Sequence, residues 1–299
     1  MSLGALGEDA LIARLLRGLP KVTAGAGIVA GAGDDCAIIG RPRDRRWTLL
    51  KADALVENVH FLRETEPRRV GWKALCRAIS DIAAMGGEPR HALITIAVPR
   101  TLPVEWLDGL YAGLKRAAKK FGVAIVGGET VRSPGPIFIN VSLTGEVERT
   151  ECVRRSGGKP GDRLYVTGRL GGSIAGKHLD FTPRLAEARW LVSHWNLQAM
   201  MDLSDGLGAD LPRLAAASGC SFRLEMEALP CTAQCSPKQA LTDGEDYELL
   251  FALPRKYAAG LELAWQTAFP KLPLTCIGTL EARSKLRQPS IPRGFDHFQ

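Results

Sequence analysis

The strongest constraint on the fold is an alternation of helical and strand-like segments that occurs twice along the chain. In the first half, helical apolar spacing is found at 11–19, 69–85 and 104–121, and short apolar runs at 91–98, 123–126 and 137–143. After the turn-rich stretch 157–162, apolar runs return at 164–167, 222–225, 247–253 and 274–277, and helical spacing at 185–195, 207–217 and 257–269. Such alternation predicts an N-terminal α/β domain over 1–148 and a C-terminal α+β domain over 149–299.

Length and composition exclude several classes of protein. A chain of 299 residues can bury two hydrophobic cores. No apolar run is long enough to cross a bilayer, and Glu8 and Asp9 precede the first amphipathic segment, unlike the order in a signal peptide. The seven cysteines are scattered in apolar contexts, as expected for reduced thiols. We therefore expect a cytoplasmic protein without a membrane partner.

The net charge of +7 suits an anionic partner. The basic residues are nevertheless spread along the chain, and no zinc-finger or RNA-recognition signature is present. We expect no nucleic-acid partner.

Acidic residues beside glycine, serine or alanine recur in both halves of the chain, and we interpret their surroundings as short turns. They are Asp34, Asp35, Asp53, Asp81, Glu129, Asp202, Asp205, Glu245 and Asp246. Carboxylates that meet in one cleft repel each other unless cations are present, and Mg²⁺ prefers such hard oxygen ligands together with substrate phosphates. Each of these acidic residues, taken alone, can also be explained by structure. For example, Ser204 or Asp205 can cap a helix that begins near Gly206. Their recurrence predicts a magnesium and phosphate site.

A second glycine-rich segment has the spacing of a different ATP site. The stretch 171–177 has the glycine and lysine spacing of a P-loop, but His178 stands where a P-loop needs Ser or Thr. We interpret it as a glycine-rich turn.

Read in order, the motifs resemble those of the thiamine-monophosphate kinase family, within the superfamily of aminoimidazole ribonucleotide synthetase. The matching segments are 33–37, 53–61, 80–86, 155–162, 202–207, 244–249 and 294–298. The resemblance implies a two-domain fold, with an N-terminal sheet that pairs across a homodimer and a C-terminal domain that closes the cleft. It also implies transfer of the ATP γ-phosphoryl group to thiamine monophosphate, with several Mg²⁺ ions.

The resemblance also implies roles for individual residues. The magnesium ligands would be Asp35, Asp53, Asp81, Glu129, Asp202 and Asp205, of which Asp35, Asp53, Asp81 and Asp202 would be catalytic. The residues that bind ATP would be Gly128, Glu129, Arg155 and Ser204. Those that bind thiamine monophosphate would be His60, Glu245 and Phe295.

The chain departs from the family pattern around the expected metals. Lys51 and Ala52 replace Ser or Thr beside Asp53, Glu129 replaces an aspartate, and Arg77-Ala78-Ile79 replaces the usual Asn-Leu. Two alternatives therefore stay open: a related ATP-dependent enzyme with another small substrate, and a nucleotide-binding paralogue with impaired catalysis. Selenophosphate synthetase is disfavoured because no reactive cysteine lies near the N-terminus.

Overall fold

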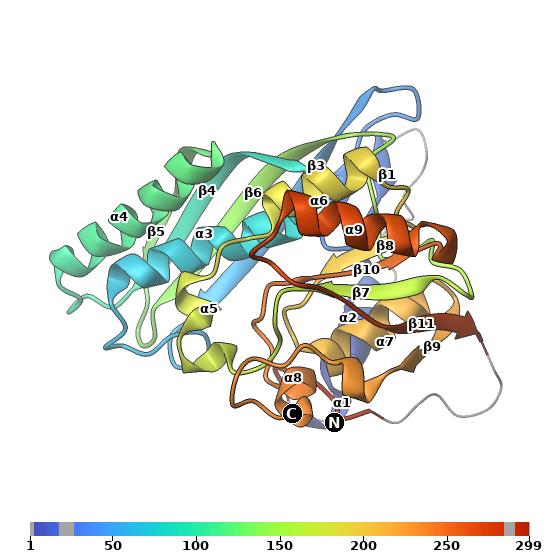
Figure 1. The fold of residues 1–299 in the computed structure, drawn as a ribbon. Coiled ribbons are helices and arrows are strands. Elements are labelled where there is room, and N and C mark those ends of the chain that lie inside the picture. The colour runs from blue at the N-terminus through green and yellow to red at the C-terminus, as the bar shows by residue number, and fades with distance from the viewer. Residues whose placement is uncertain (1–2, 18–26, 284–290, 299) are drawn as a thin grey trace.

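The computed structural model describes residues 3–17, 27–283 and 291–298 (Figure 1). The first half contains α1 (Leu3–Leu6), α2 (Glu8–Leu16), β1 (Ile28–Ala30), β2 (Ala37–Ile39), β3 (Arg46–Val56), α3 (Pro67–Ala84), β4 (Glu88–Val98), α4 (Val104–Phe121), β5 (Ala124–Arg132) and β6 (Phe138–Glu148). The second contains β7 (Arg163–Thr167), α5 (Lys177–Asp180), α6 (Leu185–His194), β8 (Ala199–Asp202), α7 (Leu207–Ala217), β9 (Cys220–Leu224), α8 (Pro237–Thr242), β10 (Leu249–Leu253), α9 (Ala258–Ala268) and β11 (Leu274–Ala282).

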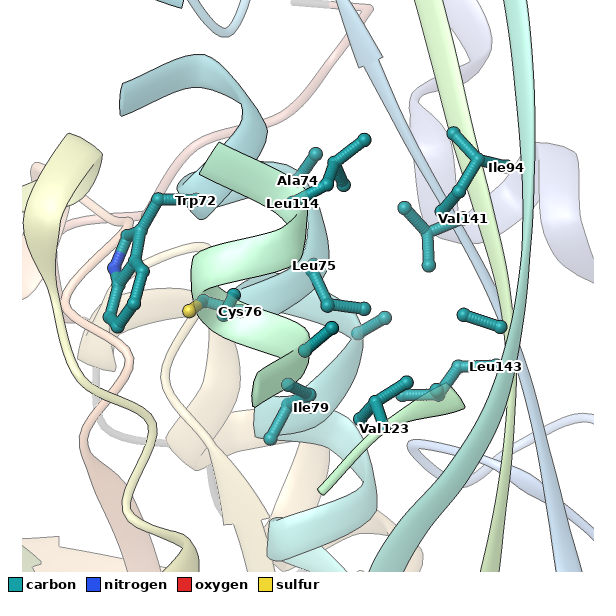
Figure 2. Close-up of a cluster of buried hydrophobic side chains, with 14 of the residues drawn as sticks. Trp72, Ala74, Leu75, Cys76, Ile79, Ile94, Leu114, Val123, Val141 and Leu143 are labelled. Atoms are coloured by element: carbon teal, nitrogen blue, oxygen red, sulfur yellow. The ribbon is translucent and has the colours of Figure 1, made fainter. Parts of the chain in front are cut away.

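The first half forms a six-stranded sheet in the order β1-β2-β3-β6-β4-β5. Only the β4 and β5 pair is parallel among its described pairings. Helices α3 and α4 cover one face (Figure 1), and Leu75 and Ile79 of α3 point toward Ile94, Val141 and Leu143 of the sheet (Figure 2). The opposite face leaves apolar side chains exposed.

Helix α3 lies at the centre of the molecule. It begins with Pro67, whose fixed φ suits a first helical position, and it ends before Gly86, which has φ +73°. A Cβ atom on Gly71 would lie 2.0 Å from the carbonyl oxygen of Leu110 on α4, so this helix pair requires glycine at the crossing. At its C-terminal end, Ala83 and Ala84 pack into the core of the second half.

The second half forms a five-stranded antiparallel sheet in the order β8-β10-β7-β11-β9. Along β7, Leu164 and Val166 face the core formed with α7 and α8, whereas Tyr165 faces the core formed with α6 and α9. Helices therefore cover both faces of this sheet (Figure 1).

The predicted mixture of α/β and α+β architecture is confirmed, and most predicted helices and strands are present. The three strands β1, β2 and β3 were not predicted, and neither were β8 and α8. Leu19 and Pro20, where we expected the first helix to end, lie outside the described residues. Among the described residues, no helix combines the length and apolarity needed to cross a membrane.

Candidate active site

Three buried aspartates from separate parts of the chain meet at the junction of the two halves. Asp35 comes from the loop between β1 and β2, Asp81 from α3, and Asp202 from the end of β8. One carboxylate oxygen from each lies within 4.8 Å of the others. The expected convergence of Asp35, Asp81 and Asp202 is therefore present.

Each of the three carboxylates has a hydrogen-bond donor beside it. The Ser80 hydroxyl donates to Asp202 over 2.6 Å, and the Arg155 guanidinium donates to Asp35 over 2.6 Å. The Lys51 ammonium lies 2.7 Å from Asp81 Oδ1. Arg155 and Lys51 thus offset part of the negative charge of the cluster.

Burial dominates the protonation equilibria of these groups. It raises the pKa of Asp202 to about 7, with a further contribution from Asp35, and it raises the pKa of Asp81 well above its ordinary value. Burial also opposes the charged form of Lys51, but the Asp81 and Asp53 carboxylates outweigh it and raise the pKa of the ammonium. An added cation would favour the ionised carboxylates.

The cluster has the donor set that Mg²⁺ requires. Asp35 Oδ2 is buried and has no hydrogen-bond partner among the described residues. Such an oxygen normally has a partner, and a metal ion satisfies it. The three aspartates supply hard oxygen ligands, so the residues fit magnesium.

Asp53 lies beside the cluster but in the middle of β3, not in a turn as we expected. Its neighbour two residues before, Lys51, points to the same face of the sheet, toward α3. Asp53 Oδ1 forms an ion pair with Arg77 of α3 at 3.2 Å. The prediction of turns was also wrong for Asp81, which lies within α3, and for Glu129, which lies within β5.

Ser204 and Asp205 do occupy a turn, between β8 and α7. Their backbone N–H groups donate to the Asp210 carboxylate over 3.1 and 3.0 Å, so Asp210 holds this turn. The Asp205 side chain forms an ion pair with Arg213 and lies outside the group of three aspartates.

Gly128 and Glu129 lie on β5 at the edge of the first sheet. The register aligns Gly128 through Ile94 and Val141 with Asp53, so β4 and β6 separate the two residues. Glu129 is exposed, and its Oε1 accepts from the N–H of Thr130. Within the described chain, Glu129 is not brought to the other expected metal ligands.

The three expected substrate residues line one pocket next to the aspartates. His60, Glu245 and Phe295 line this pocket together with Ser204, Asp205 and Arg77. They come from the loop after β3, the loop before β10 and the C-terminal segment. Only the tertiary structure brings these three segments together.

Glu245 is held in a strained loop by cationic and polar neighbours. Its φ is +53°, a conformation that is rare for residues other than glycine. Lys73 Nζ donates to it over 2.8 Å, and His178 Nδ1 lies 2.9 Å away. Burial alone would raise the pKa of Glu245, but the hydrogen bonds from His178 and Lys73 outweigh it and lower the pKa to about 2.

The sequence analysis gave no role in the site to two cationic residues, Lys73, which it did not name, and Arg77, which it named only as a departure from the family pattern. Both lie on the same stripe of α3 as Asp81, at intervals of four residues. Arg77 touches both parts of the site: it pairs with Asp53 and lines the pocket, and its Nε is buried without a hydrogen-bond partner among the described residues. The signal in the sequence that could have identified them is the four-residue spacing of charged residues, from Lys73 to Arg77 to Asp81.

The glycine-rich stretch 171–177 is a structural turn, as interpreted. The N–H of Gly171 donates to Asp246 over 3.0 Å, and the N–H of Gly172 donates to Asp243 over 2.9 Å. Lys177 forms an ion pair with Glu248 at 3.1 Å. These groups are already engaged within the chain.

Both halves of the chain are similar to known proteins. Residues 33–147 match the model of the AIR synthase related protein N-terminal domain, and 176–287 match that of the C-terminal domain. The thiamine-monophosphate kinase of Rhodopirellula baltica is 34% identical, covering 90% of this chain and 92% of the relative. That of Salmonella typhimurium is 31% identical, covering 98% and 99%.

A solved structure described as AaThiL complexed with AMPPCP and TMP superimposes with a TM-score of 0.83. It is 32% identical and covers 99% of both chains. The resemblance seen in the motifs is thus confirmed over nearly the whole length. The chain belongs to the thiamine-monophosphate kinase family, within the AIR synthase related proteins.

Proposed function

We propose that this chain transfers the γ-phosphoryl group of ATP to thiamine monophosphate and so forms thiamine diphosphate. The observation that carries the proposal is the pocket lined by His60, Glu245 and Phe295, which also contains Arg77, the ion-pair partner of Asp53 beside the three buried aspartates. A substrate phosphate held near Arg77 would then lie close to the residues that bind Mg²⁺ and nucleotide.

In this proposal, the magnesium ligands are Asp35, Asp53, Asp81, Asp202 and Asp205. Arg155 and Ser204 contact ATP. Glu129 and Gly128 belong to the same site only if β5 approaches the bound nucleotide. Bound Mg²⁺ supplies charge neutralisation for the phosphates during transfer.

The proposed transfer is direct and needs no nucleophilic side chain. The second pKa of a phosphate monoester is about 6, so the attacking oxygen is largely ionised at neutral pH. The main barrier is the electrostatic repulsion between two polyanions that must approach each other. Cations held in position lower this barrier. Arg77 and Arg155 supply such positive charge from the chain itself.

The test is to incubate the purified protein with ATP, Mg²⁺ and thiamine monophosphate and to follow the products by phosphorus NMR. Thiamine diphosphate together with ADP supports the proposal. Intact ATP binding by calorimetry without any product would instead favour the nucleotide-binding paralogue. Turnover with another small acceptor only would favour the related enzyme, and a labelled phosphoprotein intermediate from γ-labelled ATP would exclude direct transfer.

We also propose that the chain forms a homodimer through the uncovered face of the first sheet. Exposed apolar side chains gather on that sheet: Leu50 is 41% exposed, Leu93 47% and Val131 46%. Apolar side chains exposed on a sheet face or its edge favour pairing with another chain. Sedimentation of the wild-type protein should give a dimer, and Leu93→Glu should give a monomer.

We further propose that the protein functions in the cytoplasm. All seven cysteines are free thiols, which fits a reducing compartment. Fractionation of the source cells followed by immunodetection tests this location.

A further inference from the structure

The amino group of Lys51 lies inside the carboxylate cluster that the proposed function assigns to metal ions. Its Nζ is 2.7 Å from Asp81 Oδ1, the distance of a charge-assisted hydrogen bond. Asp81 is one of the three aspartates whose ligand oxygens lie within 4.8 Å of one another. A positive charge from the chain is therefore already present at one of the expected metal ligands.

The backbone of β3 holds Lys51 in this place. Lys51 and Asp53 alternate with exposed Leu50 and Ala52, so both charged side chains point to the inner face, toward α3. The strand is paired along its whole length with β6. The Lys51 side chain is only 22% exposed. Its position is set by a strand within the sheet and not by a surface loop.

The charges at the site nearly balance without any metal. Asp35, Asp53, Asp81 and Asp202 are four carboxylates, and they are accompanied by three cations, Lys51, Arg77 and Arg155. When all four carboxylates are ionised, one negative charge remains before nucleotide binds. A cluster of four carboxylates with neutral neighbours would need more external positive charge.

We infer that the Lys51 ammonium takes the place of one divalent cation at Asp81. The chain accordingly binds fewer metal ions than the same carboxylates would bind beside a neutral residue. An ammonium offers no lone pair to a metal, and a divalent ion bound to the same oxygen would be repelled by it. Asp35 Oδ2, which has no partner among the described residues, stays available for the metal that the site retains.

The inference rests on the proposed metal binding and is tested by counting ions directly. Mn²⁺ binding to the full-length protein with the non-hydrolysable ATP analogue AMPPCP is followed through the electron paramagnetic resonance signal of free Mn²⁺. Lys51→Thr should bind one additional Mn²⁺ per chain compared with the wild type. Lys51→Met should also gain this ion, because it removes the ammonium without adding an oxygen ligand.

Two variants serve as controls. Lys51→Arg keeps the positive charge and should keep the wild-type number of bound ions. Lys115→Thr removes one positive charge from an exposed position on α4 and should also keep that number. A gain in Lys115→Thr would attribute the effect to net charge and overturn the inference.

The remaining outcomes separate this inference from the proposed function. Equal non-zero numbers of ions in the wild type, Lys51→Thr and Lys51→Met would overturn the role of Lys51 and leave the metal site intact. No bound Mn²⁺ in any of them would overturn both. If Lys51→Thr does not fold, the Lys51→Met variant, which is closer in length to lysine, decides between these outcomes.

Discussion

Lys73 of α3 and Glu245 of the loop before β10 form an ion pair of 2.8 Å that joins the two halves of the molecule. The Lys73 side chain is fully buried, and its ammonium also donates to the carbonyl oxygen of His60 over 2.7 Å. Burial lowers the pKa of Lys73 to about 8, although Glu245 counteracts part of this effect. The pair holds the pocket loop against the helix that carries Asp81.

Removing one partner of this pair should destabilise the protein. Lys73→Met leaves Glu245 largely buried beside a neutral residue, and we expect a loss of about 3–5 kcal/mol in the free energy of unfolding. Lys73→Met combined with Glu245→Gln should recover part of this loss in urea denaturation. Arg46→Met breaks an exposed ion pair of 2.6 Å with Glu148 and should have a far smaller effect. Equal effects of the two single variants would contradict the prediction.

Phe295 should contribute to binding of the acceptor substrate more than to folding. Its side chain is 46% exposed and lines the pocket. Phe295→Ala should raise KM for thiamine monophosphate about tenfold, which corresponds to about 1.4 kcal/mol, with little change in kcat. Leu263→Ala, at an exposed position of α9, is the matched control and should leave KM unchanged. An unchanged KM in Phe295→Ala would remove this residue from the substrate site.

Arg77 should bind a phosphate of the substrates. Arg77→Met removes a guanidinium that lines the pocket and has an unpartnered Nε among the described residues. Loss of one charge-assisted hydrogen bond, about 1.5–3 kcal/mol, should raise KM for thiamine monophosphate by roughly 10- to 100-fold. The control Arg223→Met, from an exposed pair with Glu281, should behave as the wild type. A normal KM together with a lower free energy of unfolding would show that Arg77 acts only as the partner of Asp53.

Asp202 should be required for metal binding. Asp202→Asn keeps the size of the side chain and removes the negative charge, so fewer Mn²⁺ ions should bind and kcat should fall by about 100-fold or more. Asp108→Asn on the exposed face of α4 serves as the control. A full set of Mn²⁺ ions bound to Asp202→Asn would exclude Asp202 as a ligand.

His60 should make stability depend on pH in the mildly acidic range. Burial, together with Arg77, lowers the pKa of His60 from 6.5 to about 4. As the pH falls, the unfolded chain therefore binds this proton before the folded chain does. Neutral His60 contributes fully to the free energy of unfolding above pH 6.5, and this contribution is lost as the pH falls through 4. His60→Gln should flatten the curve of unfolding free energy against pH between 4 and 6.5, by up to about 3 kcal/mol. The exposed His91→Gln should leave it unchanged, and an identical curve for His60→Gln would contradict the assignment.

The sequence was sufficient for the elements with regular apolar spacing. Helix α4 begins and ends at the predicted residues, and α3 lies within two residues of its prediction. Strand β3 was missed because Lys51 and Asp53 stand on its inner face, where a half-buried strand ordinarily has apolar residues. Their partners, Asp81 and Arg77, lie on α3 and are distant along the chain.

For the candidate site too, part could be predicted from the sequence and part could not. The sequence by itself determined the family, the kinds of residue and the acidic motifs, because glycine, serine and aspartate occur there at fixed local spacings. Only the tertiary structure decided which charges meet. It brought Asp35, Asp81 and Asp202 together, left Glu129 on the exposed edge strand, and paired Lys51 with Asp81. The physical reason is that the energy of a charge pair depends on distance and burial, and both are set by how the sheets and α3 pack.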